Sequence, residues 1–139
     1  MIAAMAVHEP AHPLEKRDLL HADPPNPGKI DAVAAQMGAT GRAPESIDYV
    51  EITKSPALVA KAEADAVARG STWLLAQVER IRGTKSAPEM WVALAESAKK
   101  VERWYDAVRG LQAAGQDADA EALRLEKCPD YEPFKPLGK

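Results

Sequence analysis

Two histidines near the start of the chain are spaced as in a zinc-binding motif. The string HEPAH at residues 8–12 matches the pattern H-E-x-x-H. That pattern binds zinc when one helical turn brings both imidazoles to the same face. Pro10 removes a backbone N–H and disfavours helical dihedral angles at Glu9, so the sequence does not favour a helix there. We therefore predict no metal site at His8 and His12.

Two other patterns could belong to an enzyme, and both are incomplete. Residues 83–86 read GTKS, like the end of a phosphate-binding loop, but Val78 stands where the first glycine of that loop belongs. The single cysteine, Cys128, has no histidine near it in the sequence to activate it. We predict no catalytic residues and no cofactor. One cysteine also excludes an intrachain disulfide, which is typical of a cytoplasmic protein.

Four aromatic residues could form a ligand pocket or a stacking platform. They are Trp73, Trp91, Trp104 and Tyr105. Aromatic residues at helical spacing more often belong to a core or to a subunit interface. We therefore predict that these four residues belong to a core or to a subunit interface.

Composition limits the remaining classes of function. The chain has 139 residues, which is one ordinary domain, and aromatic residues make up only 5% of it. Its formal net charge of −3 gives no general attraction for nucleic acids. The apolar run at residues 1–7 is too short for a membrane span, so we predict no membrane association.

The apolar spacing predicts two long helices in the middle of the chain. The first begins at Ser55-Pro56 and continues to Gly83, with Gly70-Ser71 placed to kink it. The second follows the string SAPE at residues 86–89, which predicts a capping box. We expect the two helices to form an antiparallel hairpin over residues 55–115.

The second long helix carries an apolar stripe with the spacing of a coiled coil. From residue 91 to residue 112 the stripe advances by three and four residues in turn, which predicts one unbroken helix over residues 87–114. Such a helix would be about 40 Å long. One neighbouring helix cannot cover so long a stripe, so we predict a protein partner or self-association there.

The ends of the chain are rich in proline. Residues 1–28 are predicted to be an extended arm with two helical turns over residues 13–20, and residues 29–37 a short helix that stops at Gly38. Residues 46–53 fit a strand and a helix equally well. Residues 117–127 are predicted to be a short helix, and residues 128–139 an extended tail.

One alternative concerns DNA. Residues 34–40 look like the first helix and turn of a helix-turn-helix, with a second helix starting near Pro44. Glu45, Asp48 and Glu51 would then face the phosphates, which is electrostatically unfavourable. A DNA-binding or DNA-packaging accessory protein with such a unit near residues 30–52 is therefore the second hypothesis.

A second alternative concerns the long helix itself. Seven of its residues have the sizes and the spacing of a known repeat: Trp91, Leu94, Ala95, Ala98, Ala107, Leu111 and Ala114. On these positions residues 91–114 resemble a tetratricopeptide repeat, which implies two shorter helices in place of one. A shift back by about 34 residues, the repeat period, places the polar Lys61, Gln77 and Arg80 at packing positions. No turn residue stands between Lys100 and Trp104, so the unbroken helix is the first prediction.

Together these patterns predict a mainly α protein divided into an arm (residues 1–28), a helical domain (29–127) and a tail (128–139). We expect a non-enzymatic structural or adaptor subunit, or a protein–protein interaction module. The residues predicted to contact the partner are Trp91, Leu94, Ala98, Val101, Tyr105 and Val108 of the stripe, and Tyr131, Phe134 and Leu137 of the tail.

Overall fold

The computed structural model describes residues 7–131, and the described part of the chain is all α. It contains eight helices and no strand, which confirms the predicted class. In chain order they are α1 (Pro13–Leu20), α2 (Pro27–Ala39), α3 (Ala43–Thr53), α4 (Pro56–Arg69), α5 (Thr72–Arg82), α6 (Pro88–Lys100), α7 (Trp104–Ala113) and α8 (Asp117–Lys127).

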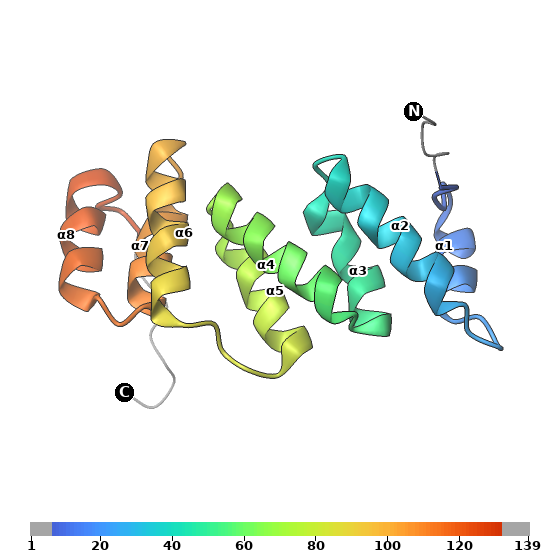
Figure 1. The fold of residues 1–139 in the computed structure, drawn as a ribbon. Helices are drawn as coiled ribbons and strands as arrows, with labels where there is room; N and C mark the ends of the chain where they lie inside the picture. The colour runs from blue at the N-terminus through green and yellow to red at the C-terminus, as the bar shows by residue number, and fades with distance from the viewer. Residues whose placement is uncertain (1–6, 132–139) are drawn as a thin grey trace, which may run out of the picture.

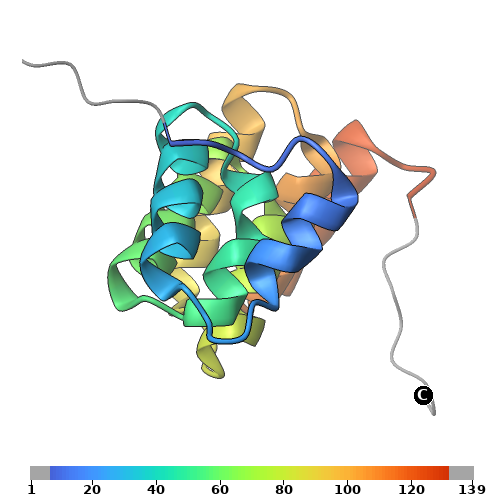
Figure 2. The same cartoon turned by 90° about the vertical axis from the view of Figure 1, so that its right-hand side faces the viewer.

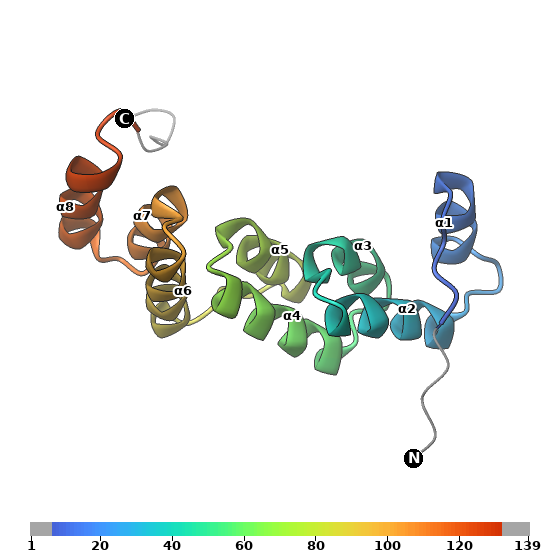
Figure 3. The same cartoon turned by 90° about the horizontal axis from the view of Figure 1, so that it is seen from above.

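Six of these helices form three packed pairs that stand in a row (Figure 1). The pairs are α2 with α3, α4 with α5, and α6 with α7. The first helices of the pairs pack on one another in order, and so do the second helices. Seen from above, α8 continues the row at one end and α1 stands at the other (Figure 3). Each pair thus buries apolar surface between its own two helices and against the neighbouring pairs, as in helical-repeat proteins.

One type of turn closes all three pairs. In each turn a residue with positive φ ends the first helix, at Gly41, Gly70 and Glu102. The amide of the next residue donates to a carbonyl five residues earlier, as in Arg42 N to Met37 O at 2.8 Å. This is the Schellman arrangement, which satisfies carbonyl groups left open at a helix end. A fourth such turn, at Gly115, joins α7 to α8.

The predicted unbroken helix over residues 87–114 is wrong. The chain turns at Val101, Glu102 and Arg103, and the amide of Arg103 donates to Ala98 O at 2.9 Å. Glu102 takes the left-handed conformation, with φ of 59°. Left-handed conformations favour glycine, so a glutamate there gives no sequence signal for a turn. The alternative with two shorter helices is the one that the structure shows.

The predicted first helix of the hairpin is also divided. Gly70 ends α4 with φ of 66°, so it closes a turn and does not kink a longer helix. The predicted single hairpin over residues 55–115 is therefore two hairpins. The successive turns at Gly41, Gly70 and Glu102 are 29 and 32 residues apart. Because these spacings are shorter than 34 residues, the shift by one repeat period in the sequence comparison matched positions that are not equivalent in neighbouring pairs.

The core runs along the row without a break between the pairs. Equivalent positions of the first helices are buried, as at Ile30, Val59 and Trp91. Gly70 allows the second pair to approach the third, because a Cβ atom there would lie 2.6 Å from the Cα of Ala98. A smaller cluster of Ala95, Val108, Leu111, Ala120 and Cys128 continues the core beneath α8.

The shorter predicted elements mostly agree with the structure. Residues 46–53, which fitted a strand and a helix, lie in α3, and residues 13–20 and 117–127 form α1 and α8. The helix predicted over residues 29–37 extends from Pro27 to Ala39, and the left-handed turn residue is Gly41 in place of Gly38. No helix within residues 7–131 is long and apolar enough to span a membrane.

The N-terminal segment is attached to the row, although an extended arm was predicted. Gln36 in α2 accepts from the Val7 amide at 2.6 Å and donates to Val7 O at 2.9 Å. Arg42 donates to both carboxylate oxygens of Glu9, at 2.7 and 2.5 Å. Lys16 of α1 forms an ion pair with Asp48 of α3. Figure 2 looks along the row from this end, with α1 in front of α3.

The predicted capping box at residues 86–89 is wrong. Ala87 is the N-cap residue of α6 and makes no side-chain capping bond. The Ser86 hydroxyl instead donates to Glu63 of α4 at 3.1 Å and accepts from Arg82 at 3.0 Å. Its amide donates to Glu79 at 2.6 Å. Ser86 therefore fastens the loop between two helix pairs to the pair before it.

Candidate functional site: an exposed aromatic surface

Most of the stripe predicted as an interface lies in the core of the chain itself. Trp91, Leu94, Ala98 and Val108 are buried between the helices of the row. They could contact a partner only if the pairs separated, so they are core residues. The prediction of one continuous apolar stripe is wrong, because the helix that would carry the stripe ends at Lys100.

The other predicted interface residues lie elsewhere. Val101 and Tyr105 are exposed at the turn between α6 and α7, and Tyr131 is half-buried beside α7. Phe134 and Leu137 are outside the described residues.

Trp73 and Tyr105 are the aromatic side chains that stand most exposed among the described residues. Their exposed fractions are 53% and 56%. Trp73 is the second residue of α5 and Tyr105 is the second residue of α7, so they hold equivalent positions in neighbouring helices. Because α5 packs on α7, both aromatic side chains belong to the face formed by the second helices.

Asp106 holds the two helix ends together beneath these side chains. Its carboxylate accepts from the Thr72 amide at 3.1 Å and from the Thr72 hydroxyl at 2.6 Å. It also accepts from Arg103 at 3.1 Å. Thr72 directly precedes Trp73 and Asp106 directly follows Tyr105, so these bonds hold together the two helix starts that carry the aromatic residues.

Tyr131 extends the exposed aromatic residues beyond α7. Its ring meets the ring of Tyr105 edge to face, with 4.9 Å between centroids and an interplanar angle of 76°. That geometry is a favourable one for aromatic pairs. Trp73, Tyr105 and Tyr131 are referred to below as the aromatic surface.

Basic side chains accompany the aromatic surface along the second helices. Arg109 is exposed one turn after Tyr105. Arg80, farther along α5 than Trp73, donates to both carboxylate oxygens of Glu51, at 2.5 and 3.2 Å. That bond holds the pKa of Glu51 below its ordinary value. The guanidinium group of Arg80 is therefore already paired within the chain, whereas Arg109 adds an exposed basic side chain on the same helix as Tyr105.

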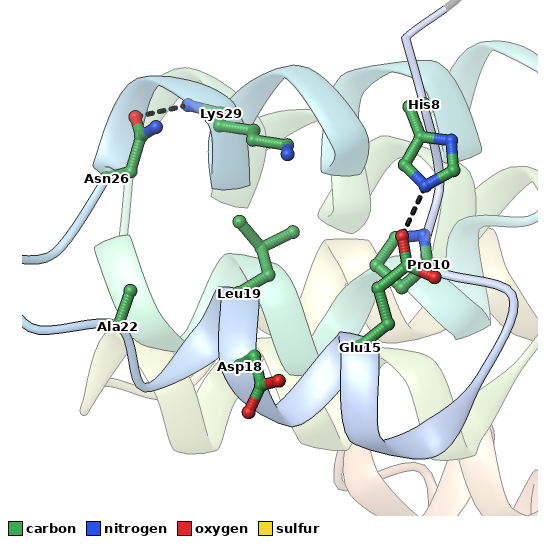
Figure 4. Close-up of a pocket in the computed structure, with 8 residues that line it drawn as sticks. All are labelled: His8, Pro10, Glu15, Asp18, Leu19, Ala22, Asn26 and Lys29. Carbon is green, nitrogen blue, oxygen red and sulfur yellow. Dashed lines mark hydrogen bonds and ion pairs between the residues drawn. The ribbon is translucent and has the colours of Figure 1, made fainter.

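A hollow of about 310 Å³ lies at the opposite end of the row, between the N-terminal segment, α1 and α2 (Figure 4). His8 points across it to Glu15 and the two side chains form a hydrogen bond. This contact, with the amide of Ala11, keeps the pKa of Glu15 below its ordinary value. Asn26 caps the amide of Lys29 at 3.2 Å. These bonds join the N-terminal segment to α1 and cap the start of α2.

The two histidines of the HEPAH string serve different partners. His12 precedes α1 as its N-cap residue, and its ring accepts from the Leu14 amide at 3.1 Å. His8 contacts Glu15. Residues 8–12 lie outside any helix, as predicted from Pro10. Within residues 7–131 no group of three or more His, Cys, Asp or Glu side chains is placed to hold a metal ion.

The segment proposed for DNA contact is packed inside the row. Its second helix, α3, buries Ile47, Tyr49 and Val50. Two of its acidic side chains, Asp48 and Glu51, form ion pairs with residues of α1 and α5. The surface left on α3 is therefore not a basic one.

Comparisons with protein-family models, with curated proteins and with solved structures find no match to this chain.

Sequence reasoning predicted Tyr105 and Tyr131 as interface residues but did not group Trp73 with them, because it placed Trp73 and Tyr105 on two facing long helices. Once the turns at Gly70 and Glu102 are known, both residues fall at the second position of a helix. Gly70 is visible in the sequence, but Glu102 is not recognisable as a turn residue. The sequence therefore indicates only one of the two turns that are needed to place Trp73 and Tyr105 at equivalent positions.

Proposed function

We propose that this protein is a non-enzymatic interaction module that binds another protein through the aromatic surface. The observation that carries the proposal is the pair of more than half-exposed aromatic side chains, Trp73 and Tyr105, at equivalent positions of adjacent helices. Tryptophan and tyrosine are the residues most often found at the energetic centres of protein interfaces. Their grouping on one rigid face is typical of a docking site.

The packing of the row supports the same proposal. The aromatic side chains stand on helices whose own apolar faces are buried, so a partner can cover them without unfolding the chain. Asp106 fixes α5 against α7, and this limits the entropy that the surface loses on binding. The partner that fits is a protein segment with apolar or aromatic side chains.

The experiment compares capture of proteins from native lysate by four immobilised chains. These are the unmodified chain, Trp73→Ala, Tyr105→Ala and Leu14→Ala. Leu14 is the control because its exposed fraction equals that of Trp73 but it lies in α1, at the far end of the row. We expect one set of proteins to be retained by the unmodified chain and Leu14→Ala, and lost with either aromatic substitution.

The expected size of the effect follows from interface energetics. Loss of a central aromatic side chain costs about 2 kcal/mol or more, roughly a 30-fold increase in Kd. Retention that is equal in all four variants would refute the proposal. Steeply salt-dependent retention of DNA by the purified chain would instead support the DNA-binding hypothesis.

A further inference from the structure

Another hollow lies at the edge of the row opposite to the turns that close the helix pairs. At this edge α3 ends, α4 begins and α5 ends (Figure 1). The hollow has a volume of about 320 Å³ and is lined by Lys54, by the first two turns of α4 and by the last two residues of α5. Its size is at the lower end of the range in which proteins bind small ligands, about 300–1,000 Å³.

The floor of this hollow is apolar and its rim is open to solvent. Val59 and Ile81 are buried residues of the lining and form the floor. Pro56, Ala60 and Lys54 are exposed and form the rim. Ala60 leaves the opening wide because its side chain is a single methyl group. A ligand can therefore reach the floor from solvent.

The charged side chains around the hollow leave one positive charge uncompensated. Arg82 donates to Glu63 at 2.6 Å, so these two lining residues neutralise each other. The carboxylate of Glu51, on the last turns of α3, accepts both of its bonds from Arg80. Within residues 7–131, Lys54 takes part in none of the ion pairs that lysines form. A ligand that brings a carboxylate to Lys54 would therefore balance the charge of the lining.

The backbone of Lys54 is fixed at the rim. Its amide donates to Val50 O at 2.7 Å and ends α3, and its φ of 52° is in the left-handed region. Glycine is the residue that usually takes this conformation. Other residues in such conformations are found more often at functional sites. The lysine thus carries its charge to one side of the apolar floor from a fixed position.

We propose that this hollow binds a small aliphatic carboxylate, with its hydrocarbon chain on Val59 and Ile81 and its carboxylate at Lys54. The lining comes from one short stretch of the row and not from a groove along it, which favours a small ligand over an extended peptide. The site is separate from the aromatic surface. Trp73 and Ile81 lie near opposite ends of α5, about 12 Å apart along the helix axis.

The test is a titration of the ¹⁵N-labelled full chain with octanoate, followed by ¹H–¹⁵N NMR. Octanol has the same hydrocarbon chain without the charge, and butanoate has the charge with a shorter chain. We expect octanoate to shift the amide signals of Lys54, Val59 and Ile81 until the site is saturated. Butanoate and octanol should bind more weakly, since each CH₂ group contributes up to about fourfold in Kd and the ion pair about three- to tenfold.

Two variants with matched controls locate the bound octanoate. Lys54→Met should weaken octanoate about three- to tenfold and bind octanoate and octanol equally, whereas Lys85→Met should keep the preference for octanoate. Ala60→Leu should weaken both ligands at least tenfold, because leucine fills the opening. Ala64→Leu, one turn farther along α4, should have no effect. Lys85 and Ala64 are exposed like the residues they control, but they lie outside the hollow.

Three outcomes would overturn the proposal. Equal binding of octanoate and octanol by the unmodified chain would mean that Lys54 recognises no carboxylate. Unchanged binding in Ala60→Leu would place octanoate elsewhere on the chain. The absence of any saturable shift, together with loss of a captured protein in Lys54→Met, would assign the hollow to a protein partner instead. None of these outcomes depends on Trp73 or Tyr105, so the proposed function is tested separately.

Discussion

Single residues decide how closely the helix pairs approach. Gly70 combines a positive φ with a site where a Cβ atom would lie 2.6 Å from the Ala98 backbone. Gly83 has a positive φ as well, but nothing lies within 4 Å of its Cβ position. The two glycines therefore separate the cost of the backbone conformation from the cost of a clash between pairs.

We predict that Gly70→Ala lowers the free energy of unfolding more than Gly83→Ala does. The left-handed conformation costs an alanine about 1–2 kcal/mol at either position. Crowding against Ala98 should add about 1–3 kcal/mol at Gly70 alone. Urea unfolding of the two variants gives the comparison. Equal losses would mean that the second pair does not approach the third at this point.

The residue scale also shows the limit of motif reading. Ser86 stands in a string that fits a capping box, yet its hydroxyl bonds to Glu63 and Arg82 of the preceding pair. A cap depends on local sequence, whereas these partners are brought near by the packing of helices. No pattern confined to residues 86–89 could have predicted them.

At the scale of helices, the sequence predicted most elements but not every boundary. Proline at a first helical position identified the starts of α1 and α4, and acidic residues identified α8. The string at residues 86–89 placed the start of α6 correctly, although the capping box predicted from it is not formed. Gly83 and Gly115 marked helix ends as predicted. The boundary between α6 and α7 was missed because Glu102 occupies a position that glycine usually fills.

We predict that Glu102→Gly and Glu96→Gly change stability in opposite directions. Glu102 has a positive φ, so glycine relieves strain there and should raise the free energy of unfolding by up to about 1 kcal/mol. Glu96 is exposed within α6, where glycine should cost about 1 kcal/mol. Chemical unfolding of both variants measures the difference. A similar loss in both would indicate an unbroken helix through residue 102.

The N-terminal segment responds to pH through Glu9. Bonds from Arg42 and Gln36 keep the pKa of Glu9 below its ordinary value. A lowered pKa in the folded chain means that attachment of the segment is strongest above the ordinary pKa of glutamate. It is lost as the pH falls through the lowered value, because the carboxylate then takes up a proton.

We predict that acid releases the segment in the unmodified chain, and that Glu9→Gln reduces this dependence to the part carried by Glu15, which bonds to His8 and to the Ala11 amide. NMR signals of the Val7 amide, which donates to Gln36, follow the attachment. In Glu9→Gln the segment should be weakly attached at every pH. Titration of Glu9 at its ordinary pKa in the folded chain would contradict the bond to Arg42.

At the scale of the whole molecule, three pairs in a row bury the apolar stripe that the sequence assigned to a partner. Leu94 and Ala98 are completely enclosed by neighbouring pairs. Periodicity predicted that they are covered but could not predict by what. The exposed residues were harder still, because the position of Trp73 beside Tyr105 depends on the contact between α5 and α7.

The central claim is that the aromatic surface binds a protein, and photo-crosslinking in cells tests it most directly. The photoreactive amino acid p-benzoylphenylalanine replaces Trp73 in one chain and Leu14, whose side chain is equally exposed, in another. Position 73 should give a discrete adduct with another protein that disappears when Tyr105→Ala is added, while position 14 gives none. No intermolecular adduct at position 73, or the same adducts from both positions, would contradict the claim.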